Sequence, residues 1–328
     1  MTEIDLDRFL AADFAGRIAL ANKARGARLW SKQLAAIWSA AAARLEETAA
    51  PDRSAGQVLL REMIALAPDD PAALQAFRRW IGDDARNGAS ATVSIVHLIV
   101  SCEKYKTRAM ALHARLAERL LPCLILLGGG AAPDAVFDEP FVIVPAADNY
   151  ESLTPKVLEG LVAVRRRFGP VGVLKIDDDT LVAGPPRPDR IAALAAATQY
   201  AGQIAGGAEF DRCWHAGKCE QRSDEPYRGR YHGTWAGGPL YYLGPQAVEL
   251  LVREYVFFPG EFDGHLYEDK AVADALRHHR ILPEEIALGD VFGLAIAGEA
   301  PPQVEHLRLS GKTEQTSRTS IAPPLPEG

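Results

Sequence analysis

Three consecutive aspartates, Asp177 to Asp179, follow directly on an apolar run in the segment GVLKIDDDTLV. The run predicts a buried strand that ends at the aspartates, where three like charges are costly unless a cation binds among them. Side chains alternate along an extended segment, so we expect Asp177 and Asp179 to face one side and Asp178 the other. Magnesium and manganese bind carboxylate oxygens and complete their shell with water and phosphate oxygens. The aspartates therefore predict a divalent metal that holds a diphosphate group.

Two other interpretations of the aspartates stay open. In the first, they form an acidic turn in which one aspartate caps the next segment. In the second, they belong to a phosphatase, because the haloacid-dehalogenase phosphatases have a motif resembling Asp-x-Asp-Gly-Thr-Leu after a strand. Here Thr180 and Leu181 follow Asp179 directly, so the intervening residue is missing, and the motif lies in the middle of the chain. Both departures disfavour the phosphatase.

The residues around the aspartates alternate between strand patterns and helix patterns. Strand patterns occur in TVSIVHLIVSC, CLILLGG, FVIVPA and VGVLKI, and amphipathic helix patterns in KTRAMALHARLAERLL and LTPKVLEGLVAVRRRFG. This order predicts an α/β fold with a mostly parallel sheet and helices on both faces. Ligands of such sheets bind at the carboxyl ends of the strands, which is where we expect the aspartates to lie.

The beginning of the chain has a different composition. It is rich in Ala, Leu and Arg at helical spacing, which predicts an all-helical region over residues 1–88, before an α/β domain over residues 89–328. The segment LLREMIALAPDDPAALQAFRRWI resembles the junction between tetratricopeptide-type units, where Pro71 opens a helix behind the cap Asp70. No second copy follows at a fixed period, so an unrelated helical hairpin that packs on the main domain is the alternative.

Composition limits the classes of protein to consider. The 328 residues are 48% hydrophobic and 24% charged, which is typical of a globular chain with a sizeable core. The net charge of -7 argues against a general nucleic-acid binder, because such proteins need a broad basic surface. The acidic start MTEIDLDRFLAADF is no secretory signal, and no apolar run is long enough to span a bilayer. We therefore expect a cytoplasmic protein without a transmembrane segment.

The four cysteines, Cys102, Cys123, Cys213 and Cys219, are too few for a disulfide framework. Cys213 and Cys219 are close enough in CWHAGKC to pair or to share a metal with His215. Reduced thiols are the interpretation that we favour.

Two later segments, TWAGGPLYYLGPQAVELL and LYEDKAVADAL, follow the aspartates in order, and NYESLTPKVLEGL precedes them. Together these four segments resemble the motifs of the β1,3-galactosyltransferase and Fringe-type glycosyltransferases, over roughly residues 93–308. The resemblance implies a GT-A fold, a UDP-sugar donor, manganese or magnesium as cofactor, and inversion at the anomeric carbon. The family has Glu-Asp-Val followed closely by Gly where this chain has EDKAVADAL, and its Golgi anchor and lumenal disulfides do not transfer to this chain.

The resemblance also implies roles for acidic and histidine residues. Asp177 and Asp179 match the metal ligands of the family, and His306 in VEHLRLS matches its distal histidine ligand, with His278 and His279 as competitors. Asp178 would meet the sugar or the ribose of the donor.

Asp269 matches the catalytic base, which takes the proton of the acceptor hydroxyl, with Glu268 beside it in the substrate site. The alternative for Asp269 is a cap on a helix that begins at Lys270.

The remaining candidates would contact the donor or the acceptor. Ser101 would lie at the end of the first strand near the uracil, and Arg108 and Lys156 match basic positions of the family near the donor, with solvated helix charges as the alternative. Gly237 and Gly238 would let the backbone approach a sugar or would form an ordinary turn.

Aromatic residues complete the set of candidates. Trp235, Tyr241 and Tyr242 could stack on a pyranose ring, although aromatic side chains at such spacing also fill cores.

Three functions remain from the sequence. The first is a UDP-sugar-dependent hexosyltransferase acting on a glycan or another hydroxyl acceptor, for example in polysaccharide synthesis. The second is a sugar- or nucleotide-binding protein without catalysis. The third is an interaction protein that binds a protein partner through its N-terminal helices.

Overall fold

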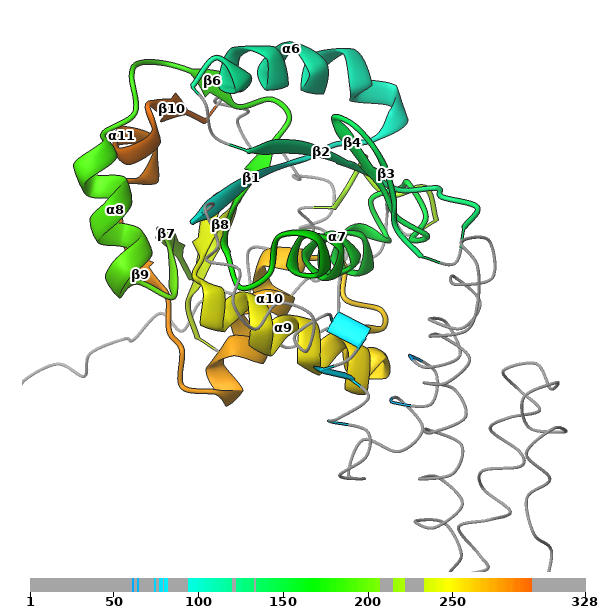
Figure 1. The fold of residues 1–328 in the computed structure, drawn as a ribbon. Coiled ribbons are helices and arrows are strands. Elements are labelled where there is room, and N and C mark those ends of the chain that lie inside the picture. The colour runs from blue at the N-terminus through cyan, green and yellow to red at the C-terminus, as the bar shows by residue number, and fades with distance from the viewer. Residues whose placement is uncertain are drawn as a thin grey trace, which may run out of the picture.

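A computed structural model describes most of the α/β part of the chain (Figure 1). The described residues are 94–119, 122–132, 134–206, 215–221 and 233–296, together with Arg61, Ile64, Leu74, Phe77, Arg78, Trp80 and Ile81.

An eight-stranded mixed sheet forms the centre of the fold, in the order β3-β4-β2-β1-β5-β8-β7-β9. Its strands are β1 (Ile95–Val100), β2 (Cys123–Leu127), β3 (Val136–Asp138), β4 (Phe141–Ile143), β5 (Gly172–Asp177), β7 (Tyr200–Ala205), β8 (Trp235–Leu243) and β9 (Glu284–Glu285). Strand β1 pairs in parallel with β2 and β5, and parallel pairing also joins β2 to β4 and β7 to β9. Strands β3 and β8 pair antiparallel with their neighbours. The predicted α/β fold with a mostly parallel sheet is thereby confirmed, and the antiparallel strands make the sheet mixed.

Helices cover both faces of this sheet (Figure 1). On one face lie α7 (Leu153–Phe168), α9 (Pro245–Phe257) and α10 (Glu268–His278), and on the other lie α6 (Lys106–Ala117), α8 (Pro188–Ala197) and α11 (Leu288–Phe292). Two short 3-10 turns, η1 (Glu103–Tyr105) and η3 (Pro259–Phe262), and a small antiparallel sheet of β6 (Leu181–Val182) and β10 (Leu294–Ala295) complete the described elements.

The central strand β1 is apolar at every position except the buried His97. Val96, Leu98 and Val100 enter the core under α7 and α9, whereas Ile95 and Ile99 enter the core under α6. Successive side chains of a strand point to opposite faces, so a strand covered on both sides is apolar at nearly every position. This continuous run is the pattern that predicted the buried strand.

The described N-terminal residues share a core with the α/β domain. Ile64, Phe77, Trp80 and Ile81 are helical and buried in the same hydrophobic cluster as α7 and α9. The ring of Phe77 packs edge-on against Phe257 of α9, with ring centres 5.4 Å apart. The rest of residues 1–88 lie outside the described residues, so the boundary at residue 88, the all-helical character and the tetratricopeptide resemblance stay predictions.

A buried ion pair fixes the same junction. Arg61 donates to both carboxylate oxygens of Glu159 on α7, at 2.9 and 2.7 Å, and the hydroxyl of Tyr255 on α9 donates to the same carboxylate at 3.0 Å. The side chain of Glu159 is only 7% exposed, so this carboxylate depends on Arg61 for charge compensation.

A helix that crosses a bilayer must be both long and apolar. Within the described part of the chain, no helix is both long enough and apolar enough to cross a membrane.

Candidate functional site

The three aspartates lie where strand β5 gives way to a turn. The strand ends at Asp177, and the N–H of Thr180 donates to the carbonyl of Asp177 at 3.1 Å, which closes a turn over Asp178 and Asp179. The predicted strand alternation therefore ends at Asp177, and the turn sets the directions of Asp178 and Asp179. The side chain of Asp177 is 37% exposed and that of Asp178 only 8%.

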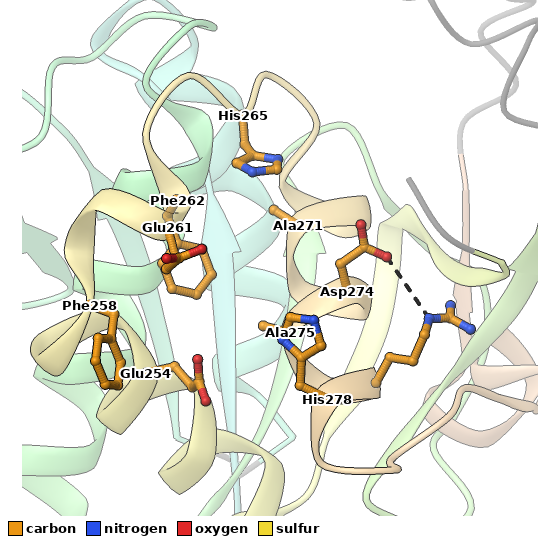
Figure 2. A pocket seen from close by; sticks show the side chains of 10 residues that line it. Glu254, Phe258, Glu261, Phe262, His265, Ala271, Asp274, Ala275 and His278 are labelled. Carbon is orange, nitrogen blue, oxygen red and sulfur yellow. Dashed lines mark ion pairs between the residues drawn. The ribbon is translucent and has the colours of Figure 1, made fainter. Parts of the chain in front are cut away.

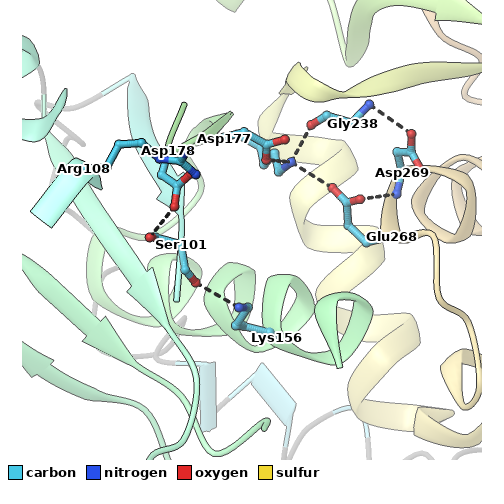
Figure 3. A network of polar contacts seen from close by, with 9 residues as sticks. Ser101, Arg108, Lys156, Asp177, Asp178, Gly238, Glu268 and Asp269 are labelled. Carbon is cyan, nitrogen blue, oxygen red and sulfur yellow. Dashed lines mark hydrogen bonds and ion pairs between the residues drawn. The ribbon is translucent and has the colours of Figure 1, made fainter. Parts of the chain in front are cut away.

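Asp178 joins the ends of two neighbouring strands. The pairing of Val100 with Asp177 places Ser101 beside Asp178, and the hydroxyl of Ser101 donates to Asp178 Oδ2 at 2.5 Å. Arg108 on α6 forms an ion pair with the other oxygen of the same carboxylate (Figure 3). The structure thus brings together three residues that were predicted to bind the sugar donor: Ser101, Arg108 and Asp178. Both oxygens of the Asp178 carboxylate contact protein groups.

Lys156 is an internal tether of this region. It is 3% exposed, and its Nζ donates to the carbonyl of Ser101 at 2.9 Å and to Asp148 Oδ1 at 3.2 Å. Burial would raise the pKa of Asp148, but N–H donors from Glu103 and Gly128 and the charge of Lys156 bring that pKa below its ordinary value. A solvated helix charge is therefore excluded for Lys156, which fixes the end of β1.

The second pair of carboxylates lies at the start of α10. Asp269 Oδ2 accepts the N–H of Gly238 at 3.0 Å, and its Oδ1 accepts the N–H of Lys270 at 2.9 Å. Glu268 Oε2 accepts the N–H of Asp269 at 2.8 Å. The helix begins at Glu268, two residues earlier than the expected Lys270, so both carboxylates compensate N–H groups of its first turn.

The surroundings of Asp269 raise its proton affinity. Burial and the neighbouring Glu268 carboxylate raise the pKa of Asp269 to about 7, against the opposing charges of Lys270 and Lys175. Burial also raises the pKa of Glu268, and Lys175 opposes that rise. A carboxylate whose pKa lies near neutrality suits a general base.

Lys175 connects the two groups of carboxylates. Its side chain is 2% exposed, and its Nζ donates to Asp177 Oδ1 at 2.5 Å and to the carbonyl of Gly238, and lies 3.2 Å from Glu268 Oε1. Burial would lower the pKa of Lys175, but Asp177 and Glu268 raise it above the ordinary value, so the ammonium stays charged. The sequence analysis missed this residue, although a lysine inside an otherwise apolar strand is a signal in itself.

The glycines before Asp269 differ in their surroundings. A Cβ on Gly238 would come within 3.3 Å of Asp269 Oδ2, which is a tight contact, whereas a Cβ on Gly237 would meet only the carbonyl of Gln203 at 3.6 Å. Gly238 therefore permits the close approach of Asp269.

Aromatic side chains line the same side of α10. Trp235 is 4% exposed, and Lys270 Nζ lies 4.3 Å from its ring centre and 4.5 Å from that of Tyr267. His215 Nδ1 lies 2.8 Å from the hydroxyl of Tyr267. Lys270 therefore lies over the ring of Trp235. Tyr241 and Tyr242 are fully buried, so they are core residues, which was the alternative to stacking on a sugar.

Tyr150 is a second residue that the sequence analysis did not single out. It is half-buried, and burial, followed by the charges of Asp269 and Glu268, raises its pKa well above the ordinary value. Its hydroxyl thus lies within electrostatic reach of the carboxylates on α10. The signal in the sequence was its place in NYESLTPKVLEGL, directly before α7.

The histidine and cysteine predictions are resolved only in part. His306 and Cys213 lie outside the described residues, so the distal metal ligand and the Cys213–Cys219 pair stay predictions. His278 is exposed at the end of α10, and His279 Nε2 lies 2.7 Å from Glu254 Oε1. Cys102 and Cys123 have free thiols.

The donor atoms of the aspartates decide whether they can hold a metal ion. Among the described residues, no group of three or more His, Cys, Asp or Glu side chains could hold a metal ion. Asp177 and Asp179 nevertheless offer hard oxygen donors, and magnesium sites often use one or two carboxylates with water and substrate phosphates as the other ligands. The donor set therefore fits such a cation when a diphosphate supplies the remaining oxygens.

A cavity of about 450 Å³ lies elsewhere, between α9, η3 and α10 (Figure 2). Its walls include Phe258, Phe262, Ala271, Ala275 and His278. Neither the aspartates after β5 nor Glu268 and Asp269 line it, so the candidate site is defined by its chemistry and not by this cavity.

Comparison of the chain with protein-family models and with curated proteins gave no match.

Proposed function

We propose that the chain is a metal-dependent, inverting glycosyltransferase, which moves a hexose from a UDP-sugar to a hydroxyl of a glycan or another acceptor. One observation carries the proposal: Asp177 and Glu268 flank a single buried ammonium, that of Lys175, and Asp269 follows Glu268 with a pKa near 7. The carboxylate that would bind the cation and the one that would act as base are thus linked through one fixed charge, Asp177 directly and Asp269 through Glu268.

The donor would bind on the side of Asp177 and Asp179. These residues would hold manganese or magnesium, and the bound cation would neutralise the charge that develops on the departing diphosphate. The guanidinium of Arg108 is 43% exposed while it pairs with Asp178, so it can also present N–H donors to a phosphate or a base. Ser101 would hold Asp178 in place through its hydroxyl, and Lys156 would hold Ser101 through its carbonyl.

The acceptor would bind on the side of Asp269. Its hydroxyl oxygen attacks the anomeric carbon of the donor while the bond from that carbon to the diphosphate oxygen breaks. Asp269 takes the proton of the hydroxyl, and UDP leaves with the bonding electrons. A single displacement of this kind inverts the configuration at the anomeric carbon.

The test is incubation of the protein with a panel of UDP-hexoses and UDP-N-acetylhexosamines, with and without manganese. Release of UDP that requires the metal, and that increases when a glycan acceptor is added, supports the proposal. If calorimetry shows that UDP binds but no donor is turned over, the result would instead support the hypothesis of a sugar- or nucleotide-binding protein without catalysis. If UDP does not bind at millimolar concentration in the presence of manganese, both hypotheses fail.

A further inference from the structure

Four residues of the candidate site form a closed ring of polar contacts (Figure 3). Lys175 donates to the carbonyl of Gly238, and the N–H of Gly238 donates to Asp269 Oδ2 at 3.0 Å. The N–H of Asp269 donates to Glu268 Oε2 at 2.8 Å, and Glu268 Oε1 lies 3.2 Å from Lys175 Nζ. The ammonium of Lys175 is thus connected to Asp269 in two ways, through the backbone of Gly238 and through the carboxylate of Glu268.

We propose that Lys175 is a positioning residue for Asp269: it holds the carboxylate in the orientation that accepts a proton, without touching substrate itself. The inference depends on the proposed function, because it assigns Asp269 the role of base. The buried ammonium donates to two oxygens, Asp177 Oδ1 and the carbonyl of Gly238, and forms an ion pair with Glu268 at 3.2 Å. The side chain of Lys175 is only 2% exposed, so its action on the reaction must pass through these partners.

The two connections act on different parts of Asp269. Lys175 fixes the carbonyl of Gly238, and the N–H of the same residue, on the other side of its Cα, donates to Asp269 Oδ2, so the contact restrains the backbone at this glycine. Glu268 is 3% exposed, and a carboxylate so deeply buried keeps its place only while an opposite charge compensates it. If Lys175 is removed, Glu268 loses that compensation and the start of α10 loses the contact that fixes it to β5.

The experiment uses Lys175→Met, which keeps an unbranched side chain but removes the charge, and the double variant Lys175→Met/Glu268→Gln, which removes both charges of the buried pair. Lys106→Met is the matched control, because it removes a lysine paired with Glu103 at the surface. Because the double variant leaves no buried charge without its partner, it provides a folded protein if the single variant does not fold.

The expected result is a fall in sugar transfer of roughly 100-fold in both Lys175 variants, the size that misplacement of a catalytic group by about 1 Å produces. In the background of Asp269→Asn, the Lys175 substitution should cause no further loss, because its effect passes through the missing carboxylate. Full additivity of the two losses would overturn the proposal, as would normal transfer in the double variant.

Hydrogen exchange gives a readout that does not need turnover. The Gly238 amide donates to Asp269, so its exchange should be slow in the unmodified protein and in Lys106→Met, and faster in both Lys175 variants. Unchanged protection of this amide in a folded Lys175 variant would contradict the inference even if transfer were lost. If no donor is turned over by the unmodified protein, the proposed function fails, while this exchange measurement still decides whether Lys175 holds Asp269.

Discussion

The backbone N–H of Gly238 donates to Oδ2 of Asp269 at 3.0 Å, and this contact joins strand β8 to the first turn of α10. The glycine has a steric reason, because a Cβ at this position would approach the same oxygen to 3.3 Å. Asp269 therefore has both of its oxygens in contact with backbone amides, one from β8 and one from its own helix. These contacts fix the carboxylate, while burial and the charge of Glu268 raise its pKa against the N–H of Lys270 and the charges of Lys270 and Lys175.

Replacement of Asp269 by Asn should separate catalysis from helix capping. Asn keeps the shape of the side chain, caps helices about as well as Asp and retains one acceptor oxygen, so the fold and UDP affinity should persist although one of the two backbone N–H groups loses its acceptor. Sugar transfer should fall by roughly 100- to 10,000-fold, which is typical of a lost general base. Steady-state transfer and calorimetry on one preparation measure both quantities.

Asp274→Asn is the matched control for that variant, since Asp274 lies on the same helix and its carboxylate is 3.9 Å from Arg277. It should transfer sugar normally. Near-normal transfer by a folded, UDP-binding Asp269→Asn variant would show that Asp269 is not the base, and Glu268 would be the next candidate.

The raised pKa of Asp269 predicts two opposite dependences on pH. Transfer should increase with pH through about 7, because only the ionised carboxylate accepts a proton. The free energy of unfolding should decrease over the interval from about 4 to about 7, because the unfolded chain releases this proton at lower pH than the folded chain does.

In Asp269→Asn the contribution of this residue to both dependences should disappear. Urea unfolding at a series of pH values, with and without the substitution, measures how the free energy of unfolding depends on pH. An identical slope in the two proteins would contradict the raised pKa.

Substitution of both Asp177 and Asp179 by Ala should abolish metal-dependent binding of UDP. The reason is that the diphosphate loses the cation that would bridge it to the protein. Calorimetry with UDP, with manganese and with a chelator, measures the effect. The double variant Asp189→Ala/Asp263→Ala removes two exposed carboxylates and so makes the same change in net charge, and it should bind UDP normally. Metal-dependent affinity that survives the loss of Asp177 and Asp179 would refute their role.

Arg61→Ala should destabilise the whole α/β domain. The substitution leaves Glu159 buried on α7 with only the hydroxyl of Tyr255, and loss of one partner of a buried pair costs on the order of 3 kcal/mol. Arg78→Ala, at an exposed position of the same N-terminal region, should change the free energy of unfolding by less than about 0.5 kcal/mol. Denaturant unfolding followed through the signal of β-structure measures both. Equal stabilities of the unmodified protein and Arg61→Ala would mean that the Arg61–Glu159 pair contributes little to the stability of the domain.

The sequence by itself determined the α/β class and the place of the aspartates. The run GVLKI is apolar at every position except Lys175 because both faces of its strand are covered, and this local pattern is readable without any knowledge of the fold. The charged residues that end the strand mark the edge of the sheet where parallel α/β folds bind ligands. Asp177 and Asp178 could therefore be selected from this pattern, whereas Glu268 and Asp269 were selected from the resemblance of LYEDKAVADAL to a glycosyltransferase motif.

Only the tertiary structure decided how these residues are connected. Lys175 and Glu268 are far apart in the chain, and their contact exists because β5, β8 and α10 meet at one point. The turn after Asp177 ended the alternation that the strand pattern had extended to Asp179. The raised pKa of Asp269 likewise depends on burial and on the charges around it, which no local pattern specifies. Residue types and periodicity fix what a segment can form, whereas charge compensation in a buried site depends on contacts between segments that the chain brings together only when it folds.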